Sequence, residues 1–478
     1  MTSRLRRSRP RGATSHIGVR VAHAALGGLA AVGWLLLPSA TDTTDTTDTT
    51  VVDRPAAPAV VAQTEDGESS ATDLILPVAA AGAAAAVATY SLVRRRRRTA
   101  LRTTPTATFE EHLAPLSDLH RRGQRLLVET DDSVRTSAEE LRFAAARSGD
   151  EAAKPYVEVL TEAQGELAIA FRLRQRLDEP GEGADTLSPD DERALLEEIL
   201  ARCTTAQRRL DAAAPGFDQL RALERETTPA LECAEARFRE LTGRTATAAT
   251  TLAGLRERYA PTACLPVVGH VEQAKDRLVF ATVELNRARQ AADTGNRERA
   301  AMHLRAAEGA VDQADVFVTG VERLAVELAR AAETAKRGAP FTGPYDDPLG
   351  VLRRQGRWPL PAHSAVTATA DFVTTHRGAV GVRARTRLAE AERHLVRAED
   401  EGAQRSHTLA QEARHLAEQD VRAYGNPYGG PVGDGIAGAL LGGILLSEAH
   451  GGERGDLKGP ACYGGTATRG RRAVGGQF

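Results

Sequence analysis

The stretch AAMHLRAAEGAVDQADVFVTGVERLAVEL, residues 300–328, decides the fold. Apolar residues recur along it in alternating steps of four and three, and residues with this spacing share one side of an α-helix. A repeat that averages 3.5 residues is also the pattern of a coiled coil. We call the first seven of these positions the seam: Ala300, Leu304, Ala307, Val311, Ala314, Val318 and Val321. The seam is the candidate packing surface of the chain.

The same alternation flanks the seam and returns later in the chain, over residues 274–288, 384–398 and 409–416. Because Ala384 lies 110 residues after Ala274, the two helical hairpins suggest an internal repeat. Residues 108–424 are therefore expected to form an all-α bundle or coiled-coil region, with breaks where Pro and Gly cluster, as at Pro215-Gly216. The spacing leaves open whether the seam closes a bundle within one chain or pairs with another chain.

A second stretch, residues 74–93, predicts a transmembrane helix. It carries no charge, and at ~1.5 Å per residue it reaches ~30 Å, the thickness of the hydrocarbon core of a bilayer. An arginine block follows at once: Arg94, Arg95, Arg96, Arg97 and Arg98. Because a charged residue costs ~2.5–3.5 kcal/mol at the membrane centre, this block is expected to stop transfer and, by the positive-inside rule, to stay in the cytosol.

Composition assigns the remaining segments. Residues 1–40 join an arginine-rich start to an apolar run, which is the pattern of a signal peptide or, if uncleaved, of a signal-anchor helix. Residues 41–73 are of low complexity and rich in Thr and Asp, so they predict an exported, disordered spacer. Residues 94–107 link the membrane to a helical region that then lies in the cytosol. The Gly-rich residues 425–478 predict a disordered tail.

Little in the sequence indicates chemistry. The 478 residues carry a net charge of −2, so no strong general attraction to nucleic acid follows. The cysteines form no CxxC pair, and the chain contains no HExxH, phosphate-binding-loop or nucleophile-elbow motif. We therefore predict no catalytic residues, no cofactor-binding residues and no metal ligands, and the chain is not expected to be an enzyme.

Two glycines interrupt a helical context in Thr375-His376-Arg377-Gly378-Ala379-Val380-Gly381. One interpretation is a helix break that positions the final hairpin. The other is a close helix contact or an anion site, in which backbone N–H groups and arginines hold a negatively charged ligand. Arg377 and Arg385 are the arginines that such a site would use.

Several motifs together resemble a known family. They are the arginine-stopped span and the runs Glu140-Leu141-Arg142-Phe143-Ala144, Ala170-Phe171-Arg172-Leu173-Arg174-Gln175, Arg377-Gly378-Ala379-Val380-Gly381, Ala384-Arg385-Thr386-Arg387-Leu388-Ala389-Glu390-Ala391 and Tyr424-Gly425-Asn426-Pro427-Tyr428. Over residues 74–478 the chain resembles the membrane-anchored TPM-domain-containing proteins of high-GC Gram-positive bacteria.

The resemblance implies a signal peptide, an exported TPM domain, one membrane span, a cytosolic helical region and a glycine-rich tail. TPM domains elsewhere resemble an acid-phosphatase-like fold. In this chain only residues 41–73 stand where the TPM domain would lie. No catalytic or metal-binding TPM residue can therefore be transferred, and the chain looks like a paralogue that lacks the exported domain.

These observations lead us to expect a membrane-anchored cytosolic helical scaffold or partner-binding protein with no catalytic activity. It would reside at the cell membrane with most of its chain in the cytoplasm. Its expected partners are membrane lipid and a protein, or a second copy through the helical seams, and not nucleic acid. An alternative is a regulatory or accessory subunit of a TPM-domain phosphatase-like membrane protein. A third hypothesis is a sensor that binds a small anionic ligand through Arg377 and Arg385.

Overall fold

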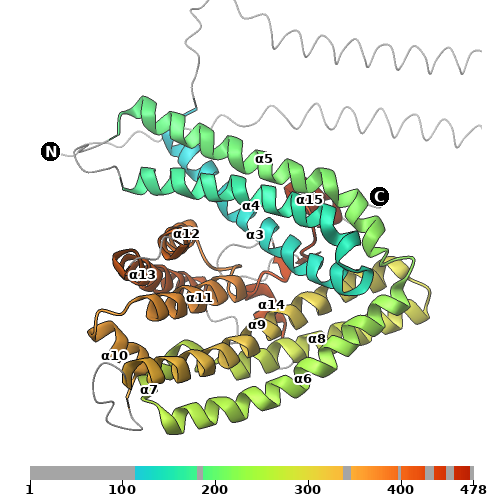
Figure 1. Ribbon diagram of the computed structural model, residues 1–478. Coiled ribbons are helices and arrows are strands. Elements are labelled where there is room, and N and C mark those ends of the chain that lie inside the picture. The colour runs from blue at the N-terminus through green and yellow to red at the C-terminus, as the bar shows by residue number, and fades with distance from the viewer. Residues whose placement is uncertain are drawn as a thin grey trace, which may run out of the picture. The chain divides into compact units, whose positions relative to one another are not determined.

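Figure 1 shows the computed structural model, in which the chain divides into residues 1–108 and residues 109–478. The structure describes residues 114–179, 187–336, 346–396, 400–425, 435–447 and 457–473. The predicted signal segment, spacer, transmembrane helix and arginine block, Arg94 to Arg98, lie outside these residues. Of the helices that are described, none is both long and apolar enough to cross a membrane.

The first three helices pack against one another as a bundle. They are α3 (Leu116–Ser148), α4 (Asp150–Asp178) and α5 (Pro189–Arg221). Gly149, at a φ of 86°, joins α3 to α4 in a conformation that favours glycine. The Ser188 hydroxyl accepts a hydrogen bond from the Asp191 amide at 3.1 Å and so caps the start of α5. The inward faces of the bundle form an apolar cluster around Leu127 and Phe171.

The break predicted at Pro215-Gly216 is wrong, because α5 continues to Arg221. Tyr156 of α4 lies so close that a Cβ at position 216 would come within 2.9 Å of its hydroxyl oxygen. The Tyr156 ring also meets Phe217 edge-on, with centroids 5.3 Å apart. Tertiary packing here outweighs the weak helix propensity of proline and glycine.

The second group of helices contains the seam. It comprises α6 (Thr227–Arg258), α8 (His270–Asp293) and α9 (Arg297–Lys336), with α7 (Pro261–Cys264) and a 3-10 turn (Leu265–Val267) between α6 and α8. α8 and α9 form a hairpin. Every seam residue lies on α9 and is at most 4% exposed. The seam packs against α6 and α8 of the same chain, where it builds two adjoining apolar clusters.

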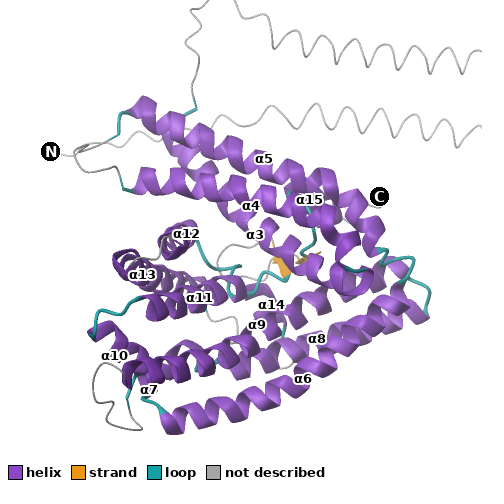
Figure 2. Cartoon of the chain, viewed as in Figure 1, coloured by secondary structure: helices purple, strands orange, loops and turns teal. Residues whose placement is uncertain are grey.

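The third group of helices also buries its alternating apolar residues. It comprises α10 (Pro348–Arg354), α11 (Pro359–Thr375), α12 (Val382–Val396) and α13 (Asp400–Tyr424). The alternating residues Ala384, Leu388 and Leu409 are at most 1% exposed and join α11 residues in a further cluster. The prediction of an all-α fold is thus confirmed for the described residues, apart from a short ribbon of strands (Figure 2).

The disordered tail predicted for residues 425–478 is wrong where the structure describes it. Residues 435–447 and 457–473 form α14 (Ile436–Leu441), an antiparallel pair of β1 (Leu445–Ser447) and β2 (Leu457–Pro460), and α15 (Thr466–Ala473). We call these two segments the C-terminal strap. α14 packs on α8, β2 on α9, and α15 on α3 and α5. Glycine, which composition associates with disorder, permits close contact here, since a Cβ on Gly438 would lie 1.8 Å from Arg277 Nη1.

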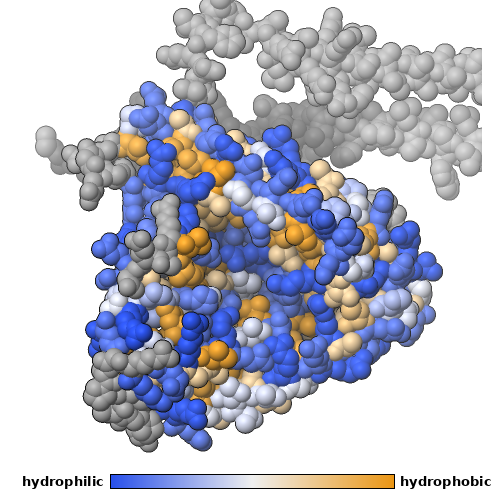
Figure 3. Space-filling model, in the orientation of Figure 1, coloured by the Kyte–Doolittle hydropathy of each residue, from blue (hydrophilic) through white to orange (hydrophobic). Residues whose placement is uncertain are grey.

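Hydrophilic residues cover most of the described surface in the view of Figure 3, and apolar residues form small separate patches. Many outward charges pair along one helix, as Lys275 does with Glu272 at 2.8 Å. Such exposed pairs are each worth only ~0.2–0.5 kcal/mol. The packing energy of the unit therefore comes from its inward faces.

Candidate functional site

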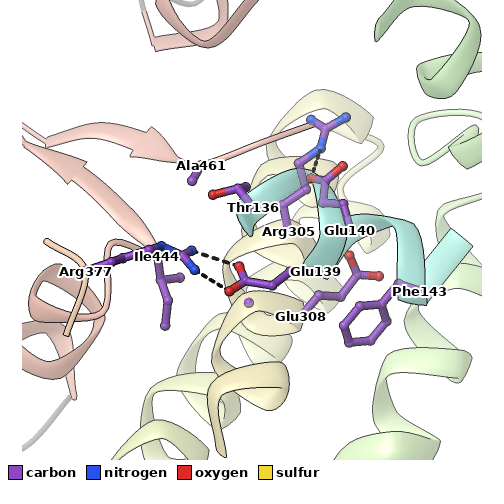
Figure 4. A pocket seen from close by; sticks show the side chains of 10 residues that line it. Thr136, Glu139, Glu140, Phe143, Arg305, Glu308, Arg377, Ile444 and Ala461 are labelled. Carbon is purple, nitrogen blue, oxygen red and sulfur yellow. Dashed lines mark hydrogen bonds and ion pairs between the residues drawn. The ribbon is translucent and has the colours of Figure 1, made fainter. Parts of the chain in front are cut away.

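The candidate site is a group of buried charged side chains where α3, α9, the turn between α11 and α12, and the strap meet (Figure 4). α3 supplies two adjacent glutamates. α9 supplies three charged residues spaced three and four apart, so these three project from one side of the helix. The turn between α11 and α12 adds an arginine. We call this group the ionic cluster: Glu139, Glu140, Arg305, Glu308, Asp312 and Arg377.

Arg377 forms the central ion pair of the cluster. Its side chain is 1% exposed, and it donates to both oxygens of Glu139, from Nη1 and, at 2.8 Å, from Nη2. Nη2 also lies 3.5 Å from the carbonyl oxygen of Gly443 in the strap. Burial alone would lower the pKa of Arg377, but Glu139, together with Asp132 and Asp312, outweighs burial and raises it. The charged pair thus ties α3 to a turn 238 residues later.

Two further pairs connect α9 to its neighbours. Arg221, at the end of α5, donates to the Glu308 carboxylate. Arg142 of α3 holds Asp312 through Nε at 2.9 Å and Nη2 at 2.5 Å. Burial raises the pKa of Glu308 and the pKa of Asp312, and the arginine that faces each carboxylate partly offsets this effect. Burial thus opposes the charged form of both carboxylates, and their ion pairs support it.

Glu140 is the least well paired member of the cluster. Neither of its carboxylate oxygens accepts a hydrogen bond from the described residues, although Arg305 Nε lies 3.4 Å from Oε1. The Thr136 hydroxyl also has no hydrogen-bond partner among those residues. These groups line a cavity of about 20 Å³ that Ile444 of the strap helps to close (Figure 4). The cavity has room for about one water molecule.

The interpretation of residues 375–381 as an anion site is not supported, because both of its arginines already hold carboxylates of the same chain. The Arg385 side chain is 1% exposed and donates from Nη1 to Asp131 at 2.5 Å and to Asp132 at 2.7 Å. Its Nη2 donates to the carbonyl oxygen of Arg377 at 2.6 Å. Arg135 and Arg385 together lower the pKa of Asp131, although its burial acts in the opposite direction.

The same residues form a helix break, as the first interpretation expects, because α11 ends at Thr375 and α12 begins at Val382. They also make a close contact with the strap. The Gly378 amide donates to the Leu441 carbonyl oxygen of the strap at 2.9 Å. A Cβ on Gly378 would lie 2.4 Å from the Leu440 carbonyl oxygen, so no larger residue fits without a shift of the backbone. The turn between α11 and α12 is therefore shaped to receive the strap.

Two buried histidines lie near the cluster. His270 of α8 packs edge-on against Phe317, with ring centroids 5.3 Å apart, and the His376 ring lies 6.5 Å from the same phenylalanine. Burial lowers the pKa of His270 to about 4 and that of His376 to about 3. Both rings are therefore neutral at physiological pH and belong to the packing.

The charged side chains of the site join distant segments of the chain through ion pairs. Within residues 114–473, as far as the structure describes them, no three or more His, Cys, Asp or Glu side chains are placed to hold a metal ion. Three carboxylates of the ionic cluster face an arginine from another helix or from the turn between α11 and α12: Glu139, Glu308 and Asp312. The arrangement neutralises charge and fixes which segments are neighbours.

Sequence reasoning singled out Arg377 as a candidate anion contact but none of the other residues of the ionic cluster. A signal was present on α9. Glu308 directly follows the seam residue Ala307, and Asp312 directly follows Val311. Because successive helical residues are turned by about 100°, these carboxylates flank the seam and do not lie opposite it. Charges that border a seam in this way are candidates for burial.

The chain is similar to two mycobacterial proteins over most of its length. UPF0603 protein Rv2345 of Mycobacterium tuberculosis (strain ATCC 25618 / H37Rv) is 28% identical over 451 aligned residues, which cover 77% of this chain and 68% of that protein. UPF0603 protein MT2410 of strain CDC 1551 / Oshkosh matches with the same identity and coverage. No family model and no solved structure matches the chain. The chain is thus homologous to UPF0603 proteins of Mycobacterium tuberculosis, whose names state no activity.

Proposed function

We propose that this protein is a membrane-anchored helical scaffold or partner-binding protein without catalytic activity, with most of its chain in the cytoplasm. The sequence supports the anchor through the uncharged residues 74–93 and the arginines that follow them. The helical unit that begins at α3 would be the scaffold.

Two arginines favour a scaffold over a sensor. Arg377 and Arg385 are the residues best suited by sequence to bind an anion, yet each lies buried with a carboxylate of the same chain. Buried ion pairs add little net stability, but breaking one leaves an uncompensated charge, so they disfavour alternative arrangements of the helices. This use of arginine suits a body that must keep one shape, and it is the observation on which the proposal mainly rests.

The long helix α9 connects all three groups of helices. This helix has 40 residues, so it extends about 60 Å. It contacts helices of all three groups, namely α3, α6, α8, α10 and α11, and also β2 of the strap. Because its seam is buried inside the unit, the outward, charged faces of the other helices are the surfaces left for partners.

The alternative function is a regulatory or accessory subunit of a TPM-domain phosphatase-like membrane protein. It draws on the sequence resemblance stated above and on the mycobacterial homologues, each of which extends beyond the aligned part. It requires the same anchor and the same helical unit. The two functions differ in the identity of the partner.

The anchor is tested with the full-length chain carrying a C-terminal epitope tag. We expect the protein to sediment with membranes and the tag to be protected from protease added to intact spheroplasts. Deletion of residues 74–98 should release the protein, whereas deletion of the spacer, residues 41–73, is the matched control and should not. Digestion of the tag in intact spheroplasts would contradict the orientation and with it the proposal.

The partner is tested by chemical cross-linking in intact membranes followed by affinity purification. A protein recovered at near-equal amount supports partner binding, and a TPM-domain protein recovered in this way supports the subunit. The matched control is the chain from which residues 74–98 are deleted, which should lose a membrane-bound partner. Recovery of the tagged chain alone, at every cross-linker concentration, would argue against both functions.

A further inference from the structure

The described residues of the C-terminal strap bury three large apolar side chains, Leu441, Ile444 and Tyr463, and three small ones, Ala439, Ala461 and Cys462. Much of the remaining contact is polar and involves the backbone of the strap. Gln313 donates to the Gly442 carbonyl oxygen at 2.6 Å, and the Thr468 amide donates to Asp211 at 2.9 Å. A segment held in this way exchanges many of its contacts for hydrogen bonds to water when it leaves.

The helices keep cores of their own beneath the strap. The cluster around Leu388 and Leu409 is built from α11, α12 and α13. The cluster of α3, α4 and α5 includes Tyr463 of the strap but is otherwise formed by helices of the body. α8 and α9 pack directly on each other and on α6. Their apolar cluster includes Ala439 and Ile444 of the strap but is otherwise formed by residues of the body. The body can therefore stay packed when the strap moves away.

Docking of the strap also buries charge that it does not fully pair. Arg469 of α15 is 9% exposed, and its Nη1 donates to the Ser133 hydroxyl at 3.0 Å. Its Nε has no hydrogen-bond partner among the described residues, and burial lowers the pKa of this arginine. Across the interface, Glu140 lies beside the cavity that the strap closes. Water would solvate both groups in an open state, so solvation opposes docking.

Glycines add to this balance. Gly442 fits against Gln313 so closely that a Cβ would lie 2.1 Å from its Oε1. Glycine loses more conformational freedom on ordering than any other residue, so a glycine-rich segment gains freedom when it is released. The strap thus fits closely against the body, while the solvation of buried charges and the conformational freedom of its glycines favour its release.

We propose that the C-terminal strap is a releasable latch, which opens while the helices of the body stay folded and thereby exposes the ionic cluster to solvent. Opening removes Ile444 from the cavity and frees the Gly378 amide, Gln313 and Arg377 from their contacts with the strap. Local opening of this kind has its own free energy, below that of global unfolding.

Amide hydrogen exchange of the full-length protein, followed by mass spectrometry, tests the latch directly. Peptides that cover residues 435–447 and 457–473 should exchange about tenfold faster, or more, than peptides from the centres of α8 and α9. Urea at low concentration should leave the exchange rate of the strap peptides unchanged, because local opening exposes little surface. If the strap exchanges no faster than α8 and α9, it opens only when the whole unit unfolds and the proposal is overturned.

A first variant tests whether the buried charge of Arg469 opposes docking of the strap. Arg469→Met removes the poorly paired charge and should slow exchange of the strap about tenfold. Ala467→Met, at an exposed position of the same helix, is its control and should leave the rate unchanged. An unchanged or faster rate in Arg469→Met overturns the argument from solvation.

Gly442→Ala should act in the opposite direction, because its methyl group meets Gln313. We expect faster exchange in the strap and no change in α8 or α9. Gly470→Ala is the control, since a Cβ there would meet nothing within 4 Å. If Gly442→Ala accelerates exchange in α8 and α9 as much as in the strap, the strap is a fixed part of the core and the latch is excluded.

Discussion

Replacing Arg377 alone is expected to lower the stability of the protein more than replacing Arg377 and Glu139 together. The perturbation is a double-mutant cycle that consists of Arg377→Met, Glu139→Leu and the double variant. Arg377 and Glu139 are 2% and 4% exposed, so water cannot solvate the group that remains when its partner is removed.

The expected magnitudes follow from this burial. Removing one partner of a buried ion pair costs about 3–5 kcal/mol, because it leaves an uncompensated charge in a medium of low dielectric constant. Replacing both partners by apolar side chains of similar volume is often neutral or stabilising. The two single losses should therefore sum to about 6–10 kcal/mol, while the double variant should lie within about 2 kcal/mol of the wild type.

The assay is urea unfolding of the full-length protein in a mild detergent, followed by circular dichroism at 222 nm, with equal urea dependence required of all four proteins. The exposed pair Lys275 and Glu272 supplies the control cycle, whose coupling energy should stay below about 1 kcal/mol. Additive losses in the Arg377–Glu139 cycle would refute the reasoning, because they would mean that the two side chains do not depend on each other.

Three further outcomes are expected. Burial holds the pKa of His270 at about 4, whereas the unfolded value is 6.5, so unfolding takes up a proton between these pH values. Between pH 7 and pH 5 the free energy of unfolding, measured in urea, should therefore fall by about 2 kcal/mol more in the wild type than in His270→Gln. Equal losses in the two proteins would contradict the assignment of a low pKa to His270. Leu304→Ala in the seam should cost about 2–5 kcal/mol, whereas Val326→Ala, at a position 68% exposed, should change stability by less than about 0.5 kcal/mol, and similar losses would place the seam outside the core. Burial raises the pKa of Cys203 to about 12, so iodoacetamide should not modify this thiol in the native protein, although it modifies Cys233. Mass spectrometry should detect the modification of Cys203 only after urea is added.

The helices were predictable because their signal is local. The steps of four and three along residues 300–328 identify both the helix and its buried side without reference to any other part of the chain. The same holds for Ala384 and Leu388 of α12, whose spacing alone indicates the buried face. Small residues on such faces let helices approach, and burial follows from the pattern.

The ionic cluster and the strap were not predictable in this way, because their determinants are far apart in the sequence. Glu139 meets its partner 238 residues later, and a charged residue that faces a distant arginine looks the same in the sequence as one that faces water. Gly438 and Gly442 resemble the glycines of a disordered tail until Arg277 and Gln313 are placed against them. Arg377 and Arg385 were considered as anion contacts under one alternative hypothesis, and in the structure they hold carboxylates of the chain itself.

The contact between α3 and the strap has a consequence for biosynthesis. Ser137 accepts a hydrogen bond from the Gly464 amide, 327 residues downstream. At about 5–20 residues per second, a ribosome needs roughly 16–65 s to make the chain between them. Throughout that interval Ser137 lacks its final partner, so water or a chaperone must satisfy its hydroxyl group in the nascent chain. A message truncated near its 3′ end would therefore yield a protein in which α3 lacks its contacts with the strap.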